Sequence, residues 1–198
     1  MRTGWLLLVC GCTASVDPFA GNDGGFTQPD GAAVSAGWGK DKCPAPSGDP
    51  VGFAVGSQVG QLPIVDCDTN APATIDDVCG AQATWIFVAH THCPTCQGTA
   101  SFTPDVAKSV ASSNIAIVHI VHDDNGTSCA AWRERYKLAG IPNVKVYADP
   151  KAEAWAAVKK SNVTAPSLIL DRNRVVTHRE HGMSSSAIKE QLDFARMR

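Results

Sequence analysis

Cys93 and Cys96 have the spacing of a redox-active cysteine pair, and they follow an apolar run directly. This run, residues 84–89, is typical of a buried strand, and the segment after Cys93 can continue as a helix. The unpaired N–H groups and the positive dipole end of a helix stabilise a thiolate in its first turn. Pro94 suits this turn because it lacks an N–H that would have no partner there. The spacing therefore predicts a pair that closes into a disulfide and reopens.

Cys93 is the expected nucleophile of the pair. It is nearest to the helix start, where its sulfur can face solvent, whereas Cys96 lies one turn further on and would resolve the mixed disulfide. His92 can place an imidazolium beside the thiolate at mildly acidic pH, so we expect it to modulate the pair. On a strand His90 shares the side of His92, but a structural role is the simpler interpretation for it. No role is expected for the remaining histidines, which are His119, His122, His178 and His181.

The composition predicts one globular domain with an appendage. A chain of 198 residues with 44% hydrophobic content can bury one ordinary core and is too short for two large domains. Its 17 Lys and Arg residues against 19 Asp and Glu residues give a formal net charge of -2. The sequence shows no basic run of the kind that tracks phosphates, so nucleic-acid binding has no support.

The first residues of the chain predict export. They contain one positive residue, a short apolar stretch and a small residue before a cysteine, and the stretch is too short to span a bilayer. Residues 9–12, Val-Cys-Gly-Cys, resemble the bacterial lipobox, in which the signal is cut before a cysteine that then carries lipid. The resemblance implies a signal peptide over residues 1–11 and a lipid anchor on Cys12; export without lipid, or a misassigned start, is the alternative. The expected location is extracytoplasmic, in the bacterial periplasm or cell envelope.

Residues 12–50 are dense in Gly, Pro, Asp and Ser and show no apolar periodicity. Such a segment cannot bury enough surface to offset its ordering entropy, so we predict a flexible tether. Together with a lipid anchor it would hold a folded domain, residues 51–198, near a membrane surface.

The other four cysteines are expected to form structural disulfides, which persist outside the cytosol. Four cysteines permit three pairings, and the sequence alone does not choose between them. We favour Cys67 with Cys79, because they flank a turn-rich stretch, which leaves Cys43 with Cys129 by elimination. Buried free thiols are the alternative for some of these residues.

From residue 51 onward, apolar runs alternate with helical stretches. The expected strands are residues 62–65, 84–89, 114–121 and 143–147, followed by a hairpin of residues 167–170 and 174–178. The expected helices are residues 93–112, 128–139, 150–160 and 184–197, the last with Ser184 as a possible N-cap. Strands that alternate with helices before a terminal hairpin and helix predict an α/β fold with a central mixed sheet and helices on both faces.

Two motifs, in this order, carry a family resemblance. The first is Cys-Pro-Thr-Cys at residues 93–96, and the second is Val-Thr-Ala-Pro-Ser-Leu-Ile-Leu-Asp at residues 163–171. With these motifs, residues 51–198 resemble the thioredoxin superfamily, most of all the membrane-tethered extracytoplasmic thiol-disulfide oxidoreductases of the TlpA and ResA type. A thioredoxin-like fold is the implied architecture.

The resemblance also implies which residues meet the substrate. Pro166 would be cis and face the redox pair, and Ala165 would offer its N–H and carbonyl to an incoming peptide as an added strand. Pro94 and Thr95 complete the expected substrate-binding residues. The alternative is that Pro166 only starts the strand that follows it.

Two departures from the family leave the direction of electron flow open. Thioredoxins usually carry tryptophan before the first cysteine, and this chain has His92 there. The buried acid of thioredoxin, six residues before the nucleophile, falls on Phe87, so that proton acceptor is absent. The resemblance favours a reductant, whereas the lost acid and the histidines also suit an oxidant or isomerase.

The leading hypothesis is a thiol-disulfide oxidoreductase that acts on exported protein thiols or disulfides. It needs no cofactor and no metal, only a membrane or periplasmic redox partner that resets Cys93 and Cys96. One alternative is a copper- or zinc-binding chaperone, because residues 90–96 supply imidazole and thiolate ligands. Another is a peroxiredoxin-like peroxidase, although the threonine that this class needs three residues before its cysteine is replaced by His90. The last alternative is a structural domain in which the disulfide between Cys93 and Cys96 stays permanently closed.

Overall fold

The computed structural model describes residues 37–45, 48, 50–67, 69–123, 128–159 and 165–198. The predicted signal peptide, the predicted lipid anchor at Cys12 and most of the predicted tether lie outside the described residues. In the part of the chain that is described, no helix has the length and apolar character needed to cross a membrane.

A seven-stranded mixed sheet forms the centre of the domain, in the order β4-β3-β7-β6-β5-β8-β9. Its strands are β3 (Ile64–Asp66), β4 (Pro72–Ala73), β5 (Ala83–His90), β6 (Ile115–His122), β7 (Val144–Ala148), β8 (Pro166–Asp171) and β9 (Val176–His181). The β5, β6 and β7 strands are parallel, whereas β8, β9, β3 and β4 pair with their neighbours in antiparallel fashion. Two further short strands, β1 (Val51–Gly52) and β2 (Gln58–Val59), pair with each other, and Gln58 also forms an isolated antiparallel bridge with Val175.

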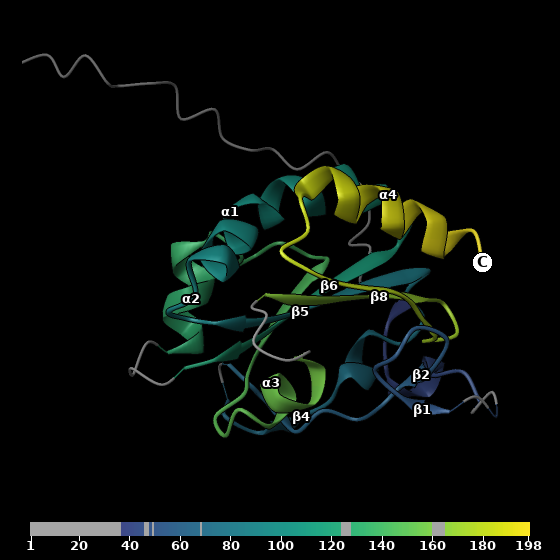
Figure 1. Cartoon of the computed structure of the whole chain (residues 1–198), viewed down its shortest axis with the longest axis horizontal. Coiled ribbons are helices and arrows are strands. Elements are labelled where there is room, and N and C mark those ends of the chain that lie inside the picture. The colour runs from purple at the N-terminus through teal and green to yellow at the C-terminus, as the bar shows by residue number, and fades with distance from the viewer. Residues whose placement is uncertain (1–36, 46–47, 49, 68, 124–127, 160–164) are drawn as a thin grey trace, which may run out of the picture. The chain divides into compact units, whose positions relative to one another are not determined.

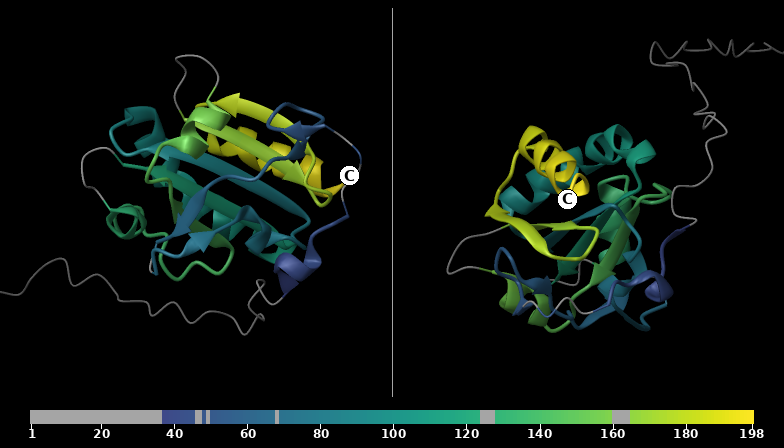
Figure 2. Two further views of the ribbon diagram at one scale, coloured as in Figure 1. Left: turned by 90° about the horizontal axis from the view of Figure 1, so that it is seen from below. Right: turned by 90° about the vertical axis from the view of Figure 1, so that its right-hand side faces the viewer.

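Helices cover both faces of this sheet, as Figures 1 and 2 show. They are α1 (Pro94–Ser109), α2 (Cys129–Arg135), α3 (Glu153–Val158) and α4 (Ser185–Arg196), with short 3-10 turns η2 (Lys40–Lys42), η3 (Ile75–Val78) and η4 (Ala111–Ser113). The α1 and α4 helices lie over one face, and α3 lies beneath the other (Figure 1). The predicted α/β architecture, a central mixed sheet with helices on both faces, is therefore confirmed.

The β5 strand is the centre of the core because it is buried on both faces. Trp85 and Phe87 point to the side of α1, α2 and α4, and Ile86 and Val88 point to the side of α3 and η3. All four side chains are fully buried. A strand with helices over both faces needs a nearly continuous apolar run, which explains why the run that precedes Cys93 does not alternate with polar residues.

Local capping explains where the helices begin and end. The Ser184 hydroxyl accepts the Ala187 N–H at 3.2 Å, which confirms the predicted N-cap of α4. The α3 helix begins later than predicted, because the Asp149 carboxylate accepts the N–H groups of Glu153 and Trp155 at 2.9 and 2.8 Å. Residues 150–152 therefore form a turn rather than the first turn of the helix.

Residues 37–45 were predicted to belong to a flexible tether, but they pack against the domain. The Trp38 indole donates to the Asn114 side chain at 2.6 Å, and the Gly39 N–H donates to the Cys79 carbonyl at 3.0 Å. Composition alone does not reveal these contacts, because their partners come from distant parts of the sequence. The predicted domain boundary at residue 51 is therefore too late.

The predicted disulfide pairing is wrong. The structure joins Cys43 with Cys79, with Cα atoms 4.8 Å apart, and Cys67 with Cys129, with Cα atoms 5.6 Å apart. Cys67 follows β3 and meets the start of α2, whereas Cys79 follows η3 and meets the packed segment of residues 37–45. Nearness in sequence misled the prediction because the intervening turns direct the two cysteines to different partners.

Candidate redox site

Cys93 lies at the junction between the end of β5 and the start of α1, as its sequence context predicts. It is the N-cap of α1, and its sulfur accepts the Cys96 N–H at 3.0 Å. The Cys93 N–H in turn donates to the His90 carbonyl at 3.1 Å, and Pro94 occupies the first turn of the helix. This arrangement directs a backbone N–H group at the sulfur that would carry negative charge.

The two sulfurs differ in access and in acidity. Cys93 is 8% exposed and Cys96 is fully buried, and both are free thiols in this structure. Burial, together with the side-chain hydrogen bond to Cys93, raises the pKa of Cys96 to about 12. The backbone groups of His90 and Ala165 offset part of this rise. Cys96 is therefore held as a neutral thiol behind the more accessible Cys93.

Pro94 and Thr95 form the exposed rim of the pair, and a glycine packs against them. Gly182 adopts a left-handed φ of 64°, and a Cβ atom built on it would lie 3.3 Å from the Thr95 side-chain methyl. The Gly182 N–H also donates to the Ala165 carbonyl at 3.2 Å. The turn between β9 and α4 thus connects Thr95 with the start of β8.

Ala165 and Pro166 lie at the start of β8, and both are buried. No cis peptide bond occurs among the described residues, so the Ala165–Pro166 bond is trans and the predicted cis-proline is wrong here. Ala165 enters the strand through a left-handed φ of 59°. Its carbonyl is already bonded to Gly182, so the predicted pairing with an incoming peptide through that carbonyl would require the bond to open.

His92 is exposed beside Cys93, and two residues that the sequence analysis missed hold its ring. The Thr91 hydroxyl donates to the Asp123 carboxylate at 3.1 Å and lies 3.2 Å from His92 Nδ1. Because the single hydroxyl hydrogen of Thr91 is given to Asp123, His92 Nδ1 must be the donor in its contact with Thr91.

A group of aromatic rings extends from this histidine. The His90 ring makes edge-to-face contacts with His92, His122 and Trp155, at centroid distances of 5.7, 5.2 and 5.5 Å. His90 and His122 are direct partners in the parallel pairing of β5 and β6. The sequence could have indicated that His122 lies beside His90, because each of these histidines ends an apolar run that forms a strand.

A buried histidine lies beside Phe87, the residue at the sequence position of the missing acid. Phe87 pairs in register with His119 of β6, and their rings are 5.0 Å apart. His119 is fully buried, its Nδ1 accepts the Trp132 indole N–H at 3.4 Å, and its Nε2 lies 3.1 Å from the Thr103 hydroxyl. Burial lowers the pKa of His119 to about 3, so the ring is neutral. A histidine with no expected role thus links β6 with α1 and α2.

The residues proposed as copper or zinc ligands do not form a ligand set. Among the described residues, the ligand atoms of three or more His, Cys, Asp or Glu side chains lie within 4.8 Å of one another only at Cys43, Asp76 and Cys79. Two of these sulfurs are joined in a disulfide and offer no thiolate. The geometry therefore gives no support to a metal site in residues 90–96.

Solved structures match this fold, although no protein-family model and no curated protein sequence matches the chain. A thiol:disulfide interchange protein of the thioredoxin family from Chlorobium tepidum aligns with a TM-score of 0.56 and 17% identity, over 72% of this chain and 98% of its own. DsbF from MTB aligns with a TM-score of 0.54 and 17% identity, over 70% and 96%. The exposed lipoprotein thioredoxin of Streptococcus pneumoniae aligns with a TM-score of 0.52 and 17% identity, over 68% and 99%. The predicted thioredoxin-like fold is confirmed.

Proposed function

We propose that this protein is a thiol-disulfide oxidoreductase that acts on exported proteins through Cys93 and Cys96. One observation carries the proposal: Cys93 caps α1 and accepts the Cys96 N–H, while the partner thiol is fully buried behind it. The similarity to thiol:disulfide interchange proteins supports the same chemistry on the same fold. The reaction needs no cofactor, because the cysteine pair itself carries the two electrons.

In the reductive direction, the proposed reaction has two steps. The Cys93 thiolate attacks one sulfur of a substrate disulfide, and the other substrate sulfur leaves as a thiolate. Cys96 then loses its proton and attacks Cys93, which releases the second substrate thiol and closes the Cys93–Cys96 disulfide. The substrate gains two electrons, and a dithiol redox partner in the membrane or periplasm must supply two more to reduce the Cys93–Cys96 disulfide, becoming a disulfide itself.

The substrate would dock on the rim that Pro94 and Thr95 form, with Ala165 and Pro166 behind it. His92 would assist as an imidazolium at mildly acidic pH, because a cation beside Cys93 stabilises its thiolate. Thr91 and Asp123 would act as positioning residues, since they fix the ring of His92. We place the protein outside the cytoplasm, anchored by lipid on Cys12, and one structural neighbour is an exposed lipoprotein.

Two cysteine variants test the proposal. Replacing Cys93 with serine should abolish reduction of a disulfide-bonded peptide, whereas Cys96→Ser should accumulate a mixed disulfide that gel electrophoresis without reductant reveals. The reduction potential of the pair gives the direction: a value near or below about -270 mV indicates a reductant, and one near about -120 mV indicates an oxidant. If neither variant changes turnover and no mixed disulfide forms, the proposal fails.

A further inference from the structure

We infer that Cys43–Cys79 is a second reducible disulfide of this protein, which dithiols open, and that Arg174 stabilises its reduced form. The site goes beyond the proposed function, which uses only Cys93 and Cys96. Cys79 precedes β5 and Cys93 follows it, so the eight residues of that strand separate the two sites, at about 3.3 Å each. The resulting distance of roughly 26 Å excludes direct exchange between the two pairs of one molecule.

The two sulfurs of this disulfide differ in access, as expected for a pair that is attacked at one side. Cys43 is partly exposed on the segment before β1, whereas Cys79 is only 3% exposed at the end of η3. An incoming thiolate can therefore reach Cys43. Thiolate attack needs access to one sulfur only, because the other leaves.

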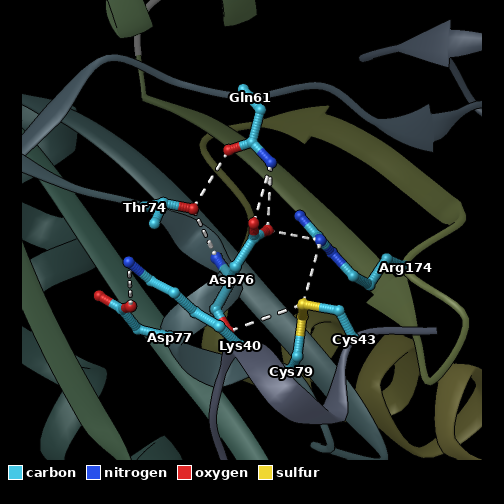
Figure 3. The surroundings of a disulfide bond; sticks show 8 residues. All are labelled: Lys40, Cys43, Gln61, Thr74, Asp76, Asp77, Cys79 and Arg174. Atoms are coloured by element: carbon cyan, nitrogen blue, oxygen red, sulfur yellow. Dashed lines mark hydrogen bonds and ion pairs between the residues drawn. A yellow bond between two sulfur atoms is a disulfide. The ribbon is translucent and has the colours of Figure 1, made fainter. Parts of the chain in front are cut away.

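A cation lies against the accessible sulfur. Arg174 contacts both Cys43 and Asp76 (Figure 3). Its Nη1 atom is 3.7 Å from Cys43 Sγ and 2.5 Å from an Asp76 carboxylate oxygen. Only 15% of the Arg174 side chain is exposed, so water weakens its charge less than on an open surface. Its Nη2 atom is buried and has no hydrogen-bond partner among the described residues.

This cation favours the reduced state over the disulfide. A disulfide sulfur is neutral and a weak acceptor, whereas a thiolate on Cys43 would accept a charge-assisted hydrogen bond from Arg174. A nearby cation is also what lowers the pKa of reactive cysteines in general. Arg174 already pairs with Asp76 while the bond is closed, and it gains a charged sulfur partner only when the bond opens. This added interaction free energy shifts the equilibrium toward the dithiol.

The surrounding residues hold Arg174 in this place. Asp76 pairs with it, and the Gln61 amide in turn donates to both carboxylate oxygens of Asp76 at 3.2 and 3.1 Å (Figure 3). The Asp76 carboxylate lies within 4.8 Å of both sulfurs, so its negative charge opposes a thiolate and reduces the effect of Arg174. Neutralising Arg174 and neutralising Asp76 should therefore shift the reduction potential of Cys43–Cys79 in opposite directions.

The electrons of the step balance with a dithiol as reductant. Its first thiolate attacks Cys43 Sγ, a mixed disulfide forms, and Cys79 leaves as a thiolate that takes a proton. Its second thiolate then attacks the reductant's own sulfur in the mixed disulfide, and Cys43 leaves as a thiolate beside Arg174. The dithiol loses two electrons and becomes a disulfide, and the two cysteines gain them. The segment that contains Cys43 then loses its covalent cross-link to Cys79 at the end of η3.

The test measures each disulfide separately in the oxidised full-length protein. The protein is equilibrated anaerobically with graded ratios of reduced to oxidised dithiothreitol, quenched in acid, alkylated, digested and analysed by mass spectrometry. Cys43–Cys79 should open at ratios that leave Cys67–Cys129 closed, with the far-ultraviolet circular dichroism unchanged. If Cys43–Cys79 opens only together with unfolding, or at the same ratio as Cys67–Cys129, the inference is wrong.

Charge variants test the role of the guanidinium. Arg174→Met should require an about tenfold higher ratio of reduced dithiothreitol, which corresponds to about 30 mV. Arg172→Met removes an exposed arginine of the same hairpin and is the matched control, with an expected change of less than about twofold. Asp76→Asn should make reduction easier, which keeps the test available if Arg174→Met does not fold. Equal shifts for the two arginine variants, or an unchanged potential in Asp76→Asn, would overturn the assignment.

The test is independent of the proposed function. The same titration in a Cys93→Ser, Cys96→Ser double variant should give the same midpoint for Cys43–Cys79, because the two sites lie at opposite ends of β5. A midpoint that disappears in the double variant would show that the pair at Cys93 supplies the electrons, and it would contradict a separate site.

Discussion

At the scale of single residues, burial separates two chemically identical thiols. Cys96 is fully buried and its pKa is raised to about 12, whereas Cys93 reaches the surface and receives a backbone N–H. At pH 7 almost all of Cys96 is therefore a neutral thiol. Iodoacetamide should therefore modify Cys93 at least about 100 times faster than Cys96 in the reduced protein, as peptide mass spectrometry can measure. Equal rates at the two sulfurs would contradict this order of attack.

A second residue-scale prediction concerns the glycine beside the redox pair. Gly182 has a φ of 64° and lies against Thr95, whereas Gly140 has a φ of 74° with open space around its Cβ position. Each glycine-to-alanine variant should cost about 1–2 kcal/mol of unfolding free energy, because a left-handed φ disfavours a Cβ atom. Only Gly182→Ala should also slow reduction of a disulfide-bonded peptide, since its methyl group would displace Thr95. Urea unfolding and turnover, measured on both variants, separate the two effects.

At the scale of elements, the neutral ring of His119 links β6 with α1 and α2. Its folded pKa of about 3 lies below the ordinary value of 6.5, because burial penalises the charged ring. Between these values the unfolded chain binds a proton that the folded chain excludes, so stability decreases as the pH falls below about 6.5. The loss could reach about 5 kcal/mol near pH 3 if this residue acted alone.

The His119→Gln variant isolates this contribution. It keeps hydrogen-bonding groups between Trp132 and Thr103 and removes the titration. Urea unfolding at pH 4 to 7 should show a shallower dependence of the free energy of unfolding on pH in the variant than in the natural chain. If the free energy of unfolding depends on pH equally in the two proteins, His119 does not cause the loss of stability at low pH.

Most elements could be predicted from the sequence because their signals are local. The strands β5 and β6 were predicted to within one residue at each end, since each is a long apolar run. The start of α3 was placed too early, because its cap comes from Asp149 outside the helix. For the site, the pattern revealed Cys93 and His92, but Thr91 and Asp123 meet only through the pairing of β5 with β6. Such contacts depend on the tertiary structure, and no local pattern encodes them.

At the scale of the whole molecule, covalent and packing links make residues 37–45 part of the folded domain. The Cys43–Cys79 disulfide spans 36 residues, and Trp38 adds a hydrogen bond to Asn114. Closing a loop of this length in the unfolded chain is worth about 3–4 kcal/mol in the chain-entropy estimate. The composition of this segment predicted a tether because it contains few apolar residues, and its stabilising partners lie far away in sequence.

A chain that starts at residue 51 should therefore be less stable than one that starts at residue 37. The expected loss is about 3–5 kcal/mol in the free energy of unfolding, measured in urea, because the disulfide and the Trp38 contact are both removed. A Cys43→Ser, Cys79→Ser double variant of the longer chain should retain part of this difference, since Trp38 and Gly39 still pack against the domain. Equal stability of the two chains would mean that residues 37–45 lie on the surface without stabilising the fold. The folded domain would then begin at residue 51, as the sequence predicts.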